Sequence, residues 1–152
     1  MPNLTKSAKI ALIAAVALTA GAATVVAQDV IAERKASMKS VGGAMGTLVR
    51  MARGQTDYDA AAALAAFNTM NEVSMKYGDL FPEGSETGGQ TKAAPAIWTD
   101  RAGFDAEVVK FQEVTASAIA AAPSDLDAFR AVFGPVGQSC GSCHEKFQLS
   151  NN

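Results

Sequence analysis

The residues of this sequence best suited to chemistry lie together near its C-terminal end. Cys140, Cys143 and His144 form the pattern Cys-x-x-Cys-His. At this spacing two thiols can add to the vinyl groups of neighbouring pyrroles in a porphyrin, and the histidine that follows is placed against the iron. A neutral imidazole in that position is the proximal axial ligand. The pattern therefore predicts one c-type haem, bound covalently through Cys140 and Cys143 and ligated by His144.

Other uses of two cysteines and a histidine agree less well with the rest of the chain. A thioredoxin-type redox pair requires a βαβ setting, which the helical pattern described below does not provide. A zinc site requires four ligands, and the sequence has two Cys and one His. A disulfide between cysteines three positions apart on a helix closes a short, strained loop and stabilises little. His144 is the only candidate base for nucleophilic or peroxidase catalysis, so we do not expect an enzyme.

Four segments with helical periodicity are available to position this site. They are residues 29–53, 57–77, 101–121 and 125–147. Thr56, Asp100 and Ser124 stand where the last three helices need an N-cap. Residues 78–95 contain prolines and glycines that exclude a continuous helix. The sequence predicts an all-α fold, an antiparallel up-down-up-down four-helix bundle with the haem near one end.

The last helix carries the site on its apolar face. One stripe alternates steps of three and four residues without interruption. Its members are Leu126, Phe129, Phe133, Val136, Cys140, Cys143 and Phe147. Both cysteines are therefore expected to face the interior of the bundle. Pro135 removes a backbone hydrogen bond, so we expect a bend there or a new helix that begins with Pro135 in its first turn.

Residues 1–27 have the pattern of a signal peptide. Lys6 and Lys9 precede an uncharged, mostly apolar run, and small residues follow it. We expect cleavage before Gln28, which leaves residues 28–152 as one four-helix-bundle domain in the periplasm. An uncleaved leader would instead anchor the chain in a membrane, although the apolar run is short for a spanning helix.

The charge of residues 28–152 excludes one class of partner. Without Lys6 and Lys9 the chain has 11 basic residues against the 15 acidic ones, a net charge near −4, and no basic run exceeds two residues. Binding to nucleic acid requires a basic patch, so no nucleic-acid partner is expected.

The second axial position of the iron decides between electron transfer and the binding of an external ligand. Because the sequence has no second histidine, methionine is the usual strong ligand that remains. In the predicted bundle the end of the last helix faces the beginning of the first, close to Met38, which lies roughly 14 Å into that helix. Met45 lies ~10 Å further along the axis, and Met51 is at the far end. Met38 is the best-placed methionine, but methionine also fills cores readily, so position alone leaves both roles open.

Arg34 lies one turn before Met38 on the same face of the first helix. Its guanidinium could pair with a haem propionate at the mouth of the pocket. A solvated surface charge is the simpler alternative, and the residues alone favour it.

These motifs together resemble class II cytochromes c, the cytochrome c′ family, over essentially all of residues 28–152. That family has Cys-x-x-Cys-His near the C-terminus, as in residues 140–147 here, Cys-Gly-Ser-Cys-His-Glu-Lys-Phe. Residues 94–98, Ala-Pro-Ala-Ile-Trp, are similar to the Pro-x-Ile-Trp that precedes the family's third helix. The family's first helix carries an arginine followed four residues later by the residue over the open face of the iron, here Arg34 and Met38.

The resemblance implies a function and a set of ligands. Most members have an apolar residue over the iron, which is then five-coordinate and high-spin, whereas a smaller low-spin subgroup has methionine there, as Met38 is here. The expected function is a one-electron Fe(II)/Fe(III) carrier with His144/Met38 ligation that exchanges electrons with periplasmic redox proteins. The alternative is a five-coordinate cytochrome c′ that binds NO or CO. The resemblance also implies a possible homodimer through the first two helices, which the apolar faces of this sequence neither favour nor exclude.

Three positions depart from the family's pattern. Gln148 stands where the family often has an arginine of the proximal pocket, so gas chemistry on that side is less expected. Lys35 replaces the usual glutamine after the arginine of the first helix, and Pro135 is not typical of the last helix.

Overall fold

The computed structural model describes the backbone of residues 6–150 and the side chains of residues 29–150. Four long helices make up most of the described chain. They are α1 (Lys6–Ala52), α2 (Ala60–Tyr77), α4 (Arg101–Ala121) and α5 (Leu126–Phe147). The connection between α2 and α4 holds a 3₁₀ turn, η1 (Gly78–Leu80), and the short helix α3 (Ala96–Thr99). The described backbone has no β-strand, and one isolated bridge joins Ala93 to Gln148.

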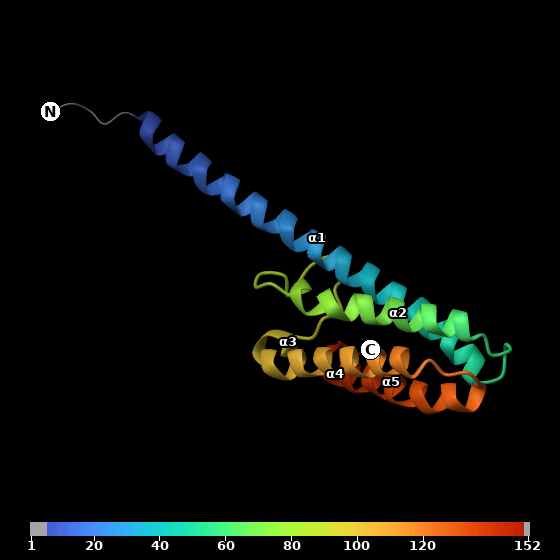
Figure 1. The fold of residues 1–152 in the computed structure, drawn as a ribbon. Coiled ribbons are helices and arrows are strands. Elements are labelled where there is room, and N and C mark those ends of the chain that lie inside the picture. Colours follow the sequence, from blue (N-terminus) through green and yellow to red (C-terminus); the bar gives the residue numbers. More distant parts are fainter. Residues whose placement is uncertain (1–5, 151–152) are drawn as a thin grey trace.

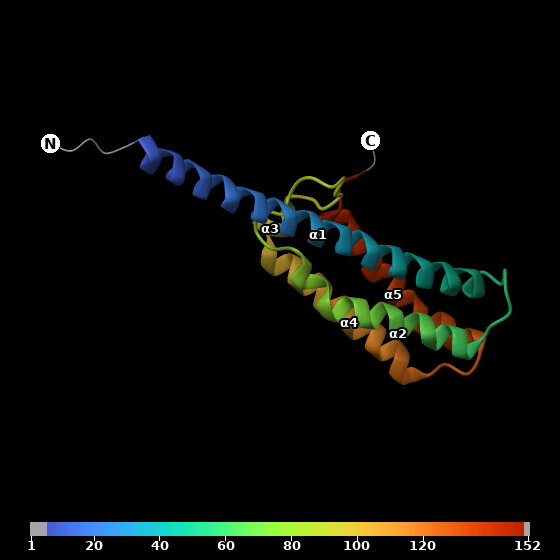
Figure 2. The same ribbon diagram turned by 90° about the horizontal axis from the view of Figure 1, so that it is seen from above.

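The long helices form an antiparallel bundle. Each runs opposite to the next along the chain, as the colours of Figures 1 and 2 show. Contacts join α1 to α2, α2 to α4 and α4 to α5, and a sparser set joins α1 to α5 and completes the bundle. The prediction of an all-α, up-down-up-down four-helix bundle is confirmed.

The predicted leader, residues 1–27, falls partly outside the described residues. Residues 1–5 are not described, and from Lys6 onward the backbone belongs to α1, whose first half extends beyond the other helices (Figure 1). Cleavage before Gln28 stays a prediction. Within residues 29–150, no helix combines the length and the apolar character needed to cross a membrane.

Aspartates cap three of the long helices. Asp100 caps α4 as predicted, since its carboxylate accepts from the N–H of Gly103 at 3.1 Å. The predicted caps Thr56 and Ser124 were wrong, because Asp59 caps α2 and Asp125 caps α5. Thr56 still belongs to the turn that ends α1, where its N–H donates to the carbonyl of Arg50.

The fourth long helix runs through its proline without a break. α5 continues from Leu126 to Phe147 with Pro135 inside it. Of the two expected alternatives, a bend or a new helix, the new helix is therefore excluded, and the bend stays a prediction. Pro135 and Ala131 are both exposed. The carbonyl of Ala131, which has lost the N–H partner that a non-proline residue would supply, can therefore be satisfied by water.

Two apolar clusters fill the described part of the bundle. The first, called the closed core here, runs along the bundle and has fully buried residues at its centre: Leu48, Phe67, Met70, Phe129 and Val136. The second, called the cavity-end cluster, consists of Leu80, Phe81, Ile97, Phe104, Val108 and Phe147. Burial of each such side chain contributes about 1.5–3 kcal/mol. The site lies where these two clusters meet.

Candidate haem site

A cavity of about 710 Å³ opens into the bundle between these clusters. Its walls come from all four long helices and from residues 90–93 of the long connection, and they are mostly apolar. The volume lies within the range of about 300–1,000 Å³ that is usual for ligand and cofactor sites. All five predicted site residues line it: Arg34, Met38, Cys140, Cys143 and His144.

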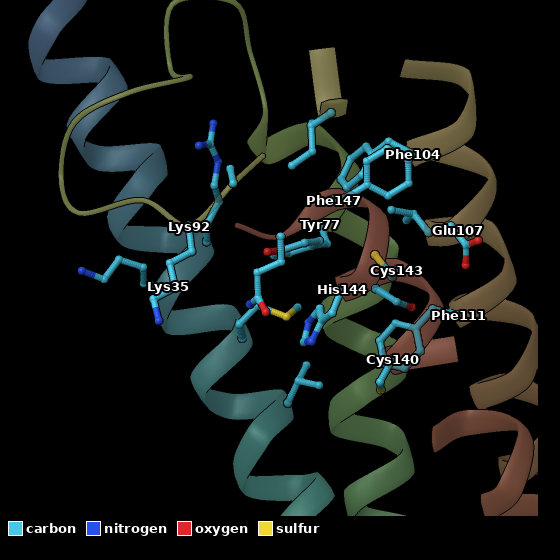
Figure 3. A pocket seen from close by; sticks show the side chains of 18 of the residues that line it. Lys35, Tyr77, Lys92, Phe104, Glu107, Phe111, Cys140, Cys143, His144 and Phe147 are labelled. Atoms are coloured by element: carbon cyan, nitrogen blue, oxygen red, sulfur yellow. The ribbon is translucent and has the colours of Figure 1, made fainter. Parts of the chain in front are cut away.

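α5 presents the Cys-x-x-Cys-His motif to this cavity on one turn of helix. Cys140, Cys143 and His144 are labelled in Figure 3, where they lie along α5 and face the space enclosed by the other helices. The two cysteines are half-buried, and neither forms a disulfide. The expectation that the apolar stripe turns both cysteines inward is confirmed.

The environment of the two thiols keeps them protonated. Burial raises the pKa of the Cys140 thiol. Burial, together with the nearby Glu107 and Cys140, raises the pKa of Cys143 to about 11. A redox-active pair needs a lowered pKa, because the thiolate is the nucleophile. The surroundings therefore disfavour a redox-active dithiol at this position.

Two methionines of α1 reach the cavity, and a third does not. Met38 and Met45 line it and are half-buried, whereas Met51 is 4% exposed and belongs to the closed core. Met38 therefore faces the same cavity as His144, from a different helix. The position that the sequence analysis preferred is available, and Met45 is its only rival among the described methionines of α1.

Arg34 is buried rather than solvated, so the alternative of a surface charge was wrong. It is 4% exposed, and its guanidinium lies 4.2 Å from the ring centre of Phe81 and 5.4 Å from that of Trp98. It donates to the carbonyls of Leu80 and Ser85 and to the Ser85 hydroxyl. Arg34 thus ties α1 to the connection that closes this end of the bundle. Its pairing with a haem propionate stays a prediction.

The long connection between α2 and α4 builds the wall around Arg34. Phe81 packs edge-to-face against Trp98, with ring centres 5.9 Å apart, and against Phe104, at 4.8 Å. Phe104 in turn meets Phe147 of α5 at 5.5 Å. Such pairs add about 0.5–1.5 kcal/mol each beyond the area they bury. Trp98 packs at the bundle end and its indole N–H donates to the Pro82 carbonyl at 3.3 Å.

A family model described as Cytochrome C' matches residues 29–148. The chain belongs to the cytochrome c′ family. Its cofactor is a covalent c-type haem, and its function is that of a haem protein for electron transfer or gas binding.

Proteins named cytochrome c-556 and proteins named cytochrome c′ are both similar to this chain. A cytochrome c-556 from Agrobacterium tumefaciens (strain II Chrys) is 36% identical over 119 residues, which cover 78% of this chain and 96% of that protein. The solved structure of cytochrome c′ from Rhodopseudomonas palustris superimposes with a TM-score of 0.79 at 35% identity, covering 82% of this chain and 98% of that one. A nitric oxide complex of a cytochrome c prime variant from Alcaligenes xylosoxidans has a TM-score of 0.72 at 32% identity, covering 82% and 97%.

The donor set and the walls of the cavity fit a haem. Two thiols, one imidazole and the thioethers of Met38 and Met45 line a space that is otherwise mostly apolar. The Ser139 hydroxyl also lines this space, and it is the only buried side-chain polar atom of residues 29–150 that lacks a hydrogen-bond partner. A bound group or an ordered water in the cavity could complete its hydrogen bonding. No group of three or more His, Cys, Asp or Glu residues in this same stretch could hold a bare metal ion instead.

Several residues of this cytochrome c′ site were missed by the sequence analysis. Tyr77 of α2 lines the cavity, and burial raises its pKa to about 12. Lys35, Lys39 and Lys92 line its mouth. Glu107 of α4 lines it as well and is 8% exposed. A signal for Glu107 was present, because it lies three residues after Phe104 and four before Phe111, on the apolar face of its helix.

Proposed function

We propose that this chain is a periplasmic one-electron carrier. In this proposal Cys140 and Cys143 hold the haem through thioether bonds, and His144 and Met38 are its axial ligands. When bound, the haem supplies the Fe(II)/Fe(III) couple. The residues of the chain fix its position, supply its ligands and keep water away from it. The protein exchanges electrons with other periplasmic redox proteins and is not an enzyme.

One observation carries the proposal: Met38 of α1 and His144 of α5 line the same cavity from two different helices. A porphyrin anchored at Cys140 and Cys143 would have His144 on one face, and α1 borders the other side of the space. A thioether from α1 can then supply the sixth ligand. The low-spin, methionine-ligated subgroup of the family is the one with such a residue at this position.

The ligand pair suits electron transfer for a physical reason. Two strong ligands held by packed helices keep the same coordination in both oxidation states, so little reorganisation accompanies a change in charge. A Met/His pair also raises the reduction potential relative to a His/His pair. The apolar side chains of Phe81, Phe104 and Phe147 would exclude water from the part of the haem that they cover.

The periplasm is supported by two features of the chain. The first 27 residues have the order of a signal peptide, basic then apolar then small. In this proposal the haem is attached at Cys140 and Cys143 after the leader has delivered the chain to the periplasm. A mass spectrum of the exported protein tests this: the polypeptide should begin at Gln28 and carry the extra mass of one haem.

A second function has its own support. The relative solved as a nitric oxide complex shares this fold at 32% identity. If Met38 only packs against the closed core, which it also contacts, the sixth position would be open to NO or CO. The protein would then be a five-coordinate gas binder with the same thioether bonds and the same His144.

The absorption spectrum of the haem-loaded protein separates these functions. We expect a low-spin ferrous spectrum with sharp α and β bands and a weak far-red band in the ferric form. Met38→Leu should convert this spectrum to a high-spin one that changes on addition of CO. Met45→Leu is the matched control, because the same residue type lines the same cavity from the same helix, and it should leave the low-spin spectrum in place.

One result would count against the carrier, and another would count only against Met38 as its sixth ligand. A wild-type protein that is already high-spin and responds to CO supports the gas binder. A low-spin spectrum that is lost in Met45→Leu but kept in Met38→Leu would still support an electron carrier. Its sixth ligand would then be Met45, about two turns further along α1.

A further inference from the structure

Glu107 is a buried carboxylate beside the attachment motif. Its side chain is only 10% exposed. It lies on α4, one turn after the buried Phe104. Figure 3 shows it next to Cys143, at the contact between α4 and α5. Aspartate and glutamate are rarely buried to this extent unless they are paired. Of the charged residues among 29–150, only Arg34 and Glu107 are buried, and both line the cavity.

The partners of Glu107 come from the motif itself. The Ser142 hydroxyl, which lies between the two cysteines, donates to its carboxylate at 2.7 Å. The ammonium group of Lys146, two residues after His144, donates to the other carboxylate oxygen at 3.1 Å. These two residues flank Cys143 and His144 on α5. One carboxylate on α4 therefore holds the turn that carries both of those haem-binding side chains.

The charge of Glu107 is retained at neutral pH. The hydrogen bond from Ser142 lowers the pKa of the carboxyl, and Lys146 and Lys110 lower it further, against the effect of burial. Lys110 and Lys146 are themselves 50% and 61% exposed. Water and salt therefore screen the two ammonium groups much more than they screen the carboxylate. Toward the cavity the net effect of the cluster is a fixed negative charge.

We propose that Glu107 has two roles toward the haem: it positions the turn that carries Cys143 and His144, and its charge lowers the reduction potential. A negative charge in a poorly screened setting stabilises the more positive oxidation state, Fe(III), relative to Fe(II). The proposal rests on the haem attachment at Cys140 and Cys143, but it does not depend on the identity of the sixth ligand. It applies equally to a carrier and to a gas binder.

The test compares Glu107→Gln with Glu113→Gln in the haem-loaded protein. Glu113 lies on the same helix but is exposed and does not line the cavity. At a fixed ambient potential, Glu107→Gln should shift the Fe(II)/Fe(III) ratio toward Fe(II) by at least about threefold, and Glu113→Gln should leave it unchanged. The optical spectrum of both variants should keep the wild-type spin state. A spin state that differs from the proposal would bear on Met38, whereas an unshifted ratio in Glu107→Gln would overturn only the role of Glu107.

Two further variants separate charge from position and protect the test against a Glu107→Gln protein that does not mature. Lys146→Met removes a compensating cation while it leaves the carboxylate, so it should shift the ratio in the opposite direction, toward Fe(III). Ser142→Ala keeps both charges and removes one hydrogen bond to the turn, so it should lower the thermal midpoint with little change in the ratio. A Lys146→Met protein with a ratio shifted toward Fe(II) would contradict the electrostatic role.

Discussion

The two ends of the bundle are built differently. The closed core is filled by the chain's own side chains, with Leu48, Phe67 and Phe129 all at 0% exposure. At the cavity end the side chains leave a space of about 710 Å³, and the two charged residues that are buried within residues 29–150, Arg34 and Glu107, lie at its walls. Hydrogen bonds and aromatic contacts hold those walls around the space. The closed core is complete without a cofactor, whereas the cavity end is organised around a volume that the chain does not fill.

The size of the cavity makes this difference energetically important. The mostly apolar walls of a space of about 710 Å³ lack the packing partners that a bound group would supply. Without such a group, water has access to these walls and they are held less tightly than the closed core. A bound haem should stabilise this end selectively, and the closed core should be much less sensitive to it.

Removal of the attachment site is the strongest way to test that comparison. The double substitution Cys140→Ser and Cys143→Ser should abolish Soret absorbance and reduce the free energy of unfolding by more than any single truncation described below. Amide hydrogen exchange should accelerate most in residues 78–95 and 139–148, while residues 60–70 and 126–136 stay protected. Equal acceleration at both ends would show that the two ends are not independent.

Paired phenylalanine truncations sharpen the comparison. Phe129→Ala in the closed core should cost about 3–5 kcal/mol of unfolding free energy, whether or not haem is attached. Phe104→Ala in the cavity-end cluster should cost a similar amount only in the haem-loaded protein, because that end is already loosened without haem. Urea unfolding of both variants, each in the wild-type and the Cys140→Ser, Cys143→Ser background, measures the four values. If Phe104→Ala costs the same unfolding free energy in both backgrounds, haem does not stabilise the cavity end selectively.

The two tyrosines offer a smaller, pH-dependent comparison between the ends. Burial raises the pKa of Tyr77, at the cavity, to about 12, against an ordinary value near 10. Because the folded state holds this proton more tightly than the unfolded state, Tyr77 contributes stability below about pH 10, and that contribution, about 2–3 kcal/mol, is lost as the pH rises toward 12. Tyr77→Phe should make the free energy of unfolding less dependent on pH in this window.

Tyr58 provides the control for that experiment. It lies against Phe129 at the other end of the bundle, where burial and two aspartates, Asp125 and Asp59, also raise its pKa. Its hydroxyl donates to the Pro123 carbonyl, and Tyr58→Phe removes this hydrogen bond. Unlike Tyr77→Phe, this substitution should therefore lower the free energy of unfolding even at pH values at which the tyrosine is not ionised. A Tyr77→Phe protein with the same steep loss of stability above pH 10 as the wild type would contradict the assignment of that loss to the cavity.

The sequence anticipated much of the fold and the position of the site. The uninterrupted stripe from Leu126 to Phe147 correctly turned both cysteines inward, because a helical period fixes which side chains share a face. The predicted antiparallel order of the helices also placed Met38 in the part of α1 that lines the cavity. Helix boundaries were less well predicted. Thr56 and Ser124 are suitable N-caps by type. The connecting turns extend past them, however, so α2 begins only at Ala60 and α5 only at Leu126, and Asp59 and Asp125 are the N-caps.

By itself the sequence determined the chemistry of the attachment motif and the helical class, since both depend on residue types at short spacings along one chain. Only the tertiary structure decided how Arg34 and Glu107 are used. Arg34 meets Leu80 and Ser85 some fifty positions later, and Glu107 meets Ser142 and Lys146 from another helix. A charged residue on a helix looks solvated until the packing of distant segments removes it from water, and no local pattern records which segments those are.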